Sequence, residues 1–97
     1  MEVLKPKAMD VHPGEEIAGW ARAQLEIARS ILDNPGGGLL FATQTIGQVK
    51  SALHERDAAR WEDVVAELDR AEDAGVRREF DAARGRLDKV VAKLTSH

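Results

Sequence analysis

The most regular hydrophobic pattern in this chain lies in its last quarter. Apolar residues recur there at steps of four and three positions: Val76, Phe80, Ala83, Leu87, Val90 and Leu94. Steps of this size place all members on one side of an α-helix. An apolar side this narrow has to be covered by other helices. The pattern therefore predicts a helix over residues 76–94 that packs into a larger helical core.

A helix with the same spacing is predicted over residues 13–33. Its inward positions are Ile17, Trp20, Ala21, Gln24, Ile27, Ala28 and Ile31, with Leu25 and Leu32 widening the buried side. Gln24 is the polar exception in this set. Pro13 suits a first helical position, and the two acids that follow it match the positive end of the helix dipole. Residues 34–38, which read Asn-Pro-Gly-Gly-Gly, must end this helix and reverse the chain.

Two more helices are predicted between this loop and residue 76. The inward positions of residues 39–55 are Leu39, Ala42, Ile46, Val49 and Leu53. The pattern then slips by one position, and the next apolar set is Trp61, Val64, Val65, Leu68 and Ala71. The slip indicates a break near residues 54–58 and a third helix over residues 58–73, with Asp57 as its N-cap and Gly75 as a left-handed residue after its end. A single kinked helix is the alternative.

Together these segments predict an all-α fold: a small antiparallel four-helix bundle with heptad-like packing. A chain of 97 residues has room for one core. We therefore expect one domain over residues 12–97, preceded by an extended or flexible arm over residues 1–11. The pattern leaves open whether a second copy completes the bundle by dimerisation.

The composition limits the cellular compartments in which we expect the protein. The chain contains no cysteine, which excludes disulfides and thiolate metal sites. No segment has the apolar run of a signal sequence or a membrane span. We expect a cytoplasmic protein without a membrane partner.

Charged residues are unevenly distributed around a formal net charge of −3. Helical spacing gathers a basic strip on the last helix, consisting of Arg78, Arg86, Lys89 and Lys93, and an acidic strip on the third, consisting of Glu62, Asp69 and Asp73. The two strips flank their hydrophobic stripes in opposite senses, so we expect them not to pair with each other across the hairpin. They would instead meet other helices, a second copy or an acidic partner. An acidic chain is a poor general binder of nucleic acid.

Catalytic chemistry finds no support in the residue pattern. The histidines, His12, His54 and His97, are far apart in sequence, and His54 with Asp57 supplies only two metal ligands. No serine or threonine has a histidine beside it in a nucleophile motif. We expect neither an enzyme nor a cofactor, metal or small-molecule substrate. A ligand carrier, with Gln24 and Thr43 as inward polar groups, is a weaker alternative.

The segment that stands out for function is residues 34–49, which carry no charge. Its residues beside the core stripe form a predicted partner interface: Leu40, Phe41, Gln44, Thr45 and Gln48. Interface centres are poor in charge and rich in aromatic residues. A helix buried on several sides by its own bundle is the alternative explanation. The leading hypothesis is a self-associating, protein-binding module of the adaptor, chaperone or inhibitor type. A nucleic-acid-associated regulator that uses the basic strip is the alternative.

Overall fold

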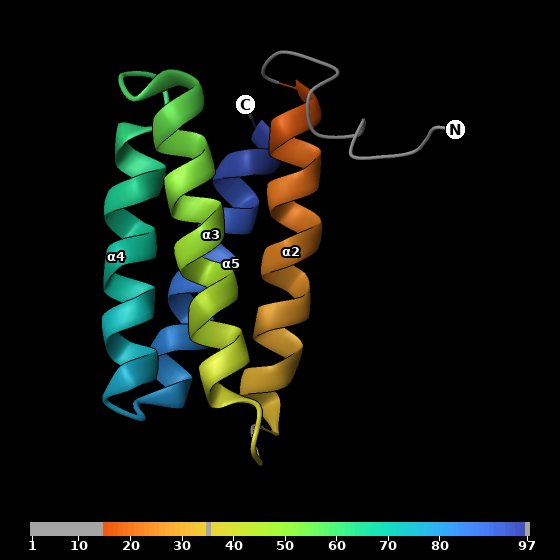
Figure 1. The fold of residues 1–97 in the computed structure, drawn as a ribbon, viewed down its shortest axis with the longest axis vertical. Coiled ribbons are helices and arrows are strands. Elements are labelled where there is room, and N and C mark those ends of the chain that lie inside the picture. Colours follow the sequence, from red (N-terminus) through yellow and green to blue (C-terminus); the bar gives the residue numbers. More distant parts are fainter. Residues whose placement is uncertain (1–14, 35, 97) are drawn as a thin grey trace.

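The computed structural model describes residues 15–34 and 36–96, which form four helices. These are α2 (Glu15–Asp33), α3 (Leu39–Asp57), α4 (Glu62–Val76) and α5 (Phe80–Ser96). Each helix packs antiparallel against the next, and α5 closes the ring against α2. In Figure 1, α3 stands between α2 and α4, with α5 behind it. The predicted all-α four-helix bundle is confirmed. The predicted arm, His12, Pro13 and His97 lie outside the described residues.

The core is built from the small and branched aliphatic residues of all four helices. Its fully buried members on α3, α4 and α5 follow the predicted spacing: Ala42, Ile46, Val49, Leu53, Val64, Leu68, Ala71, Ala83, Leu87 and Val90. Trp61, in the turn between α3 and α4, is also fully buried and is the largest side chain in the core. Each of these helices therefore turns one continuous apolar side inward.

The buried side of α2 is centred differently from the prediction. Ala21, Leu25, Ala28 and Leu32 are fully buried, whereas 49 % of Ile27 is exposed. Gln24 is half-buried beside them. A strict seven-residue repeat drifts by roughly 20° per two turns against a straight helix, so two neighbouring stripes fit the same sequence. The structure selects the stripe with the leucines at its centre and leaves Ile27 at its edge.

The break between α3 and α4 is real, but it lies later than predicted. Residue Asp57 ends α3, residues 58–61 form a turn, and α4 begins at Glu62 with Trp61 in the N-cap position. Asp57 therefore does not cap a helix that starts at residue 58. Its Oδ1 atom instead accepts a hydrogen bond from the Arg60 N–H at 3.2 Å, inside the turn. The single kinked helix is excluded.

The α4–α5 turn also differs from the prediction. Val76 ends α4 with 65 % of its surface exposed, and α5 begins only at Phe80. The left-handed residue is Arg78, with φ 64°, and not Gly75. Gly75 is buried inside α4, where an added Cβ would lie 3.3 Å from the Thr43 methyl group. That glycine therefore allows α3 and α4 to pack closely at this end of the bundle.

Candidate functional site

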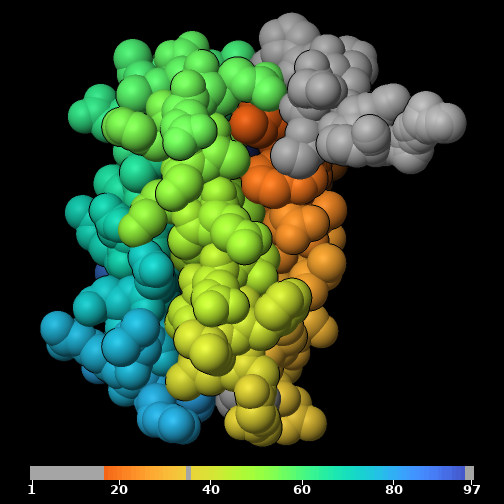
Figure 2. All heavy atoms as spheres, viewed as in Figure 1, coloured from red at the N-terminus to blue at the C-terminus, as the bar shows by residue number. Residues whose placement is uncertain are grey.

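Apolar side chains are exposed on the outer surface of α3. Leu40 is 67 % exposed and Phe41 57 % exposed, and Gln44 and Gln48 lie on the same outer surface. We call these four residues the neutral face of α3; Figure 2 shows α3, in yellow and green, running down the middle of one side of the molecule. Thr45, which was predicted to belong to this surface, is only 4 % exposed. Its hydroxyl donates a hydrogen bond to the Phe41 carbonyl at 2.9 Å, so it faces inward.

The first turn of α3 exposes backbone as well as apolar side chains. Gly38 occupies the N-cap position without a side-chain hydrogen bond, and the first turn contains no acidic residue. The first intrahelical bond runs from the Ala42 N–H to the Gly38 carbonyl at 3.0 Å. The three N–H groups before Ala42 therefore have no partner within the helix. This end of α3 is a positive dipole end without a matching acid of its own.

The seam between α2 and α3 is uncharged over most of its length. Helical geometry places four residues of α2 on its α3-facing flank: Trp20, Gln24, Ile27 and Ile31. The matching flank of α3 holds Phe41, Thr45, Gln48 and Ala52. The exposed large apolar residues of the described chain are Ile27, Leu40, Phe41 and Val76, all on α2, α3 or α4. One side of the bundle therefore carries this exposed apolar surface, and α5 contributes none of it.

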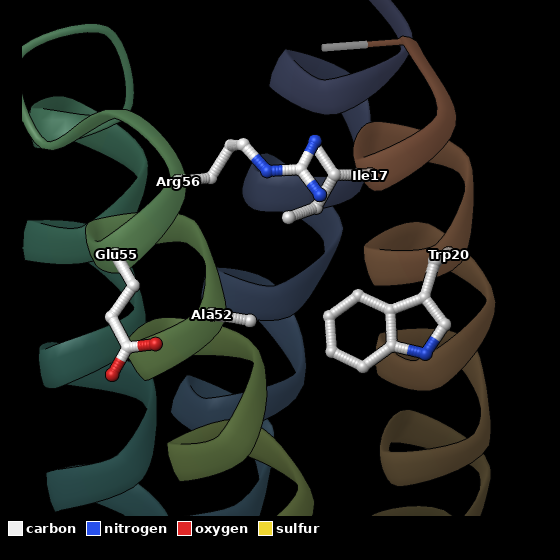
Figure 3. Close-up of a pocket in the computed structure, with 5 residues that line it drawn as sticks. All are labelled: Ile17, Trp20, Ala52, Glu55 and Arg56. Atoms are coloured by element: carbon white, nitrogen blue, oxygen red, sulfur yellow. The ribbon is translucent and has the colours of Figure 1, made fainter. Parts of the chain in front are cut away.

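A pocket of about 300 Å³ lies at the far end of this seam from Phe41. Its lining consists of Ile17, Trp20, Ala52, Glu55 and Arg56, and we call it the Trp20 pocket. Figure 3 shows the Trp20 indole pointing from α2 towards the Ala52 methyl group of α3. The Arg56 guanidinium reaches towards Ile17, whereas the Glu55 carboxylate lies on the outer side of α3. The pocket is thus lined by three apolar and two charged side chains.

Ion pairs cross both seams of α5. On the α2 side, Arg29 Nε lies 2.7 Å from Asp88 Oδ1, and this hydrogen bond raises the pKa of the Arg29 guanidinium. On the α4 side, Arg86 Nη1 lies 2.7 Å from Glu67 Oε2. Glu67 is only 8 % exposed, and the hydrogen bond from Arg86 lowers the pKa of its carboxyl group. Charged residues of α5 therefore form ion pairs with both neighbouring helices.

The seam between α3 and α4 has one central cation. Lys50 Nζ lies 2.6 Å from Asp69 Oδ1 and 2.7 Å from Glu72 Oε1. These two hydrogen bonds raise the pKa of the Lys50 ammonium group. Gly47 lies beside this cluster, since a Cβ added to it would be 3.3 Å from Glu72 Oε2. The α3–α4 seam is therefore polar and partly filled by intramolecular pairs.

The predicted charged strips are largely used within the molecule. Arg86 and Lys93 of the basic strip pair across the hairpin with α4, at Glu67 and at Asp63 Oδ2, the latter 3.2 Å away. Neither Glu67 nor Asp63 belongs to the acidic strip, so these two ion pairs do not join the basic strip to the acidic strip.

Within the acidic strip, Asp69 meets Lys50 of α3, and Asp73 Oδ2 lies 3.1 Å from Arg77 Nε. Asp69 thus meets another helix, as expected for the acidic strip. Asp73 instead pairs with a residue four positions later in the chain, at the end of α4. Glu62 and Lys89 are exposed at the surface, as is Arg78. The strips therefore offer less free charge to an outside partner than their residue types indicate.

Other kinds of site are weakly represented in the part of the chain that the structure describes. No group of three or more metal-ligating side chains occurs among those residues. The hydroxyls of Thr43 and Thr95 donate to carbonyl groups of their own helices. No helix among the same residues combines the length and apolarity needed to cross a bilayer. The exposed apolar side is thus the most distinctive surface of the described residues.

Comparison with known proteins adds no relative: this chain matches no family model, no curated protein and no solved structure.

Proposed function

We propose that this chain is a non-enzymatic protein-interaction module, of the adaptor, chaperone or inhibitor type, that acts through the neutral face of α3. The observation behind the proposal is the exposure of Leu40 and Phe41, 67 % and 57 %, within a segment that carries no charge. Covering each such side chain is worth about 1.5–3 kcal/mol when burial is complete. A protein surface that covers both residues therefore gains binding energy without having to desolvate a charge.

The neutral amides beside these residues fit the same role. Gln44 and Gln48 each carry donors and an acceptor, so they can pair with a partner's backbone or amides without an ionic cost. Interface centres combine aromatic anchors with few charges in this manner. The partner is a second copy of the chain or another protein.

The test is a pair of charge insertions on the neutral face, Leu40→Glu and Phe41→Glu. Both side chains are exposed, so we expect helicity by circular dichroism to stay near that of the wild type. Self-association, measured by light scattering across a gel-filtration peak over a range of protein concentration, should be lost. Capture of an added protein partner should be lost with it.

The matched control is Ala82→Glu, at an exposed position on α5. It adds the same side chain on a helix without exposed large apolar residues, and we expect it to leave association unchanged. If Leu40→Glu and Phe41→Glu both associate as strongly as the wild type, the neutral face of α3 is not the interface.

The alternative of a nucleic-acid-associated regulator has weaker support. Two of the four basic-strip residues, Arg86 and Lys93, already pair with acids of α4. Phosphate contacts would have to break or share these pairs. Under this alternative, DNA or RNA binding should weaken steeply with salt and fall in a Lys89→Glu variant.

A further inference from the structure

We propose that the partner of the neutral face is a second copy of this chain, bound antiparallel along α3, with Phe41 of each copy in the Trp20 pocket of the other. The proposal rests on the proposed function and specifies its partner. It also joins two features that are separate within one molecule, an exposed aromatic side chain and a pocket with an apolar wall. Both lie on the same side of the bundle.

The positions of Phe41 and the pocket suit a twofold axis. Phe41 and Ala52 lie on the same α2-facing flank of α3, eleven residues apart, or about 16 Å along the helix. A twofold axis in the interface plane, perpendicular to α3 at the level of Gly47, reverses α3 and keeps α2 on the same side. It therefore brings the partner's Phe41 to the level of Ala52. The reciprocal contact forms at the other end, as an isologous interface requires.

The pocket has the size and lining for a phenyl ring. Its volume of about 300 Å³ exceeds the roughly 150 Å³ of an apolar cavity known to hold benzene. Ile17, Trp20 and Ala52 supply its apolar wall. An aromatic pair between Trp20 and the partner's Phe41 would add to the stabilisation from burial. The partner's Phe41 fills a space that residues 15–34 and 36–96 leave open.

The surface near the axis permits close approach of the two α3 helices. A shallow hollow beside α3 is lined by the neutral residues Gln44, Gly47, Gln48, Ser51 and Ala52 and by the charged residues Lys50, Glu55 and Glu72. Gly47 contributes no side chain there, and Lys50 and Glu72 form an ion pair within one molecule. Gln48 lies next to the axis, where its amide can pair with the same amide of the partner. No like charges meet at the centre of this interface.

The charges at the two ends are complementary. With the axis at Gly47, Glu55 lies at the level of the partner's Leu39, where the partner's α3 begins. That helix end has no side-chain cap and no acidic residue in its first turn. A carboxylate beside the positive end of a helix dipole is stabilising. The antiparallel dimer therefore gives each α3 the acid that its own first turn lacks.

The first test uses two variants that damage different halves of the same contact. Phe41→Ala removes the ring, and Ala52→Phe fills the pocket from within. Each variant alone should dimerise at least about 30-fold more weakly than the wild type, as expected for an aromatic hot spot. An equimolar mixture should regain dimer, because the Ala52→Phe copy still carries Phe41 and the Phe41→Ala copy still has an open pocket. Sedimentation velocity measures all four samples.

The second test reads the orientation directly and does not depend on the pocket variants folding. The chain has no cysteine, so single cysteines can be introduced cleanly. Gln48→Cys places the two thiols at positions that differ by only about 3 Å along the length of α3, and it should form a disulfide-linked dimer on mild oxidation. Glu55→Cys places them about 24 Å apart and should not. A parallel dimer would link both variants.

The outcomes separate this inference from the proposed function. Full dimerisation by Ala52→Phe, or linkage through Glu55→Cys, would overturn the pocket and the antiparallel arrangement, while loss of dimer in Phe41→Glu would still support the neutral face. A wild type that stays monomeric at all concentrations but binds another protein through Leu40 and Phe41 would overturn the second copy as partner alone. A dimer that both glutamate changes leave intact would overturn both proposals.

Discussion

At the scale of single residues, Glu67 is the most buried charged side chain among the residues that the structure describes. It is 8 % exposed, and its carboxylate accepts hydrogen bonds from Arg86 at 2.7 Å and from Arg70 at 3.4 Å. A buried acid without these guanidinium partners would be costly. With them, the charged form is favoured, and the pKa of the carboxyl group falls below its ordinary value. Glu67 thus connects the inner edge of α4 to α5.

The lowered pKa gives a stability prediction with a definite sign. A carboxyl group with a lower pKa in the folded state stabilises the fold above its unfolded pKa, about 4.3, and loses that contribution as the pH falls through the folded value. Glu67→Gln should therefore lower the free energy of unfolding by about 1–2 kcal/mol at pH 7. The difference from wild type should shrink in acid. Urea titrations at several pH values measure it, with the exposed Glu62→Gln as control; a gap that does not change with pH would contradict the role of the charge.

At the scale of helices, glycine has opposite consequences in two places. Gly85 lies in the exposed middle of α5, with no atom within 4 Å of an added Cβ. Gly75 is buried in α4, where the same Cβ would lie 3.3 Å from Thr43 Cγ2. The first glycine only costs helix stability, whereas the second permits close packing of α3 and α4.

These surroundings predict opposite effects of adding side chains. Gly85→Ala should raise the free energy of unfolding by about 0.5–1 kcal/mol through helix propensity alone. Gly75→Val should lower it by about 1–3 kcal/mol, because the added methyl groups must push α3 and α4 apart. Chemical denaturation of both variants measures the two changes. A Gly75→Val variant at least as stable as the wild type would show that packing at Gly75 does not limit the α3–α4 distance.

Periodicity along one helix accounts for what could be predicted of these elements. The stripes through Ile46, Leu68 and Leu87 each depend only on spacing within one segment, and these three central residues are buried, whereas Val76 at the start of the last stripe is exposed. The centre of α2 could not be chosen, because Ile27 and Leu25 fit two stripes of nearly equal hydrophobicity. The turn at residues 58–61 follows from the burial of Trp61, which depends on neighbouring helices and not on local signals.

At the scale of the whole molecule, the candidate surface was predictable in part. The absence of charge over residues 34–49 marks Leu40 and Phe41 directly in the sequence. The Trp20 pocket could not be predicted, because it requires the register of α2 against α3. The pairing of Arg86 with Glu67 likewise depends on the register of α5 against α4. Contacts between helices become definite only when all four helices are placed.

The whole-molecule arrangement also predicts how far the exposed side extends beyond α3. Ile27 is 49 % exposed on the α3-facing flank of α2, about two turns from Trp20, which places it near the proposed twofold axis. Ile27→Glu should therefore weaken dimerisation roughly tenfold, less than Phe41→Glu, through the loss of apolar contact. Sedimentation velocity provides the comparison, with Ser30→Glu, an exposed α2 position, as the matched control. Equal effects at positions 27 and 30 would place the interface elsewhere.

Because four antiparallel helices return the chain to its starting end, the beginning of α2 and the end of α5 lie at the same end of the bundle. Asn34 and residues 36–38 lie at the opposite end. Circular permutation is therefore accessible: a short linker from α5 to α2, with new termini between Gly36 and Gly37, gives the order α3, α4, α5, α2. Such a permutant keeps every seam of the bundle but places the neutral face in the first helix synthesised. Phe41 would then lie a few residues from a chain end, where a probe attached to that end would report on its surroundings.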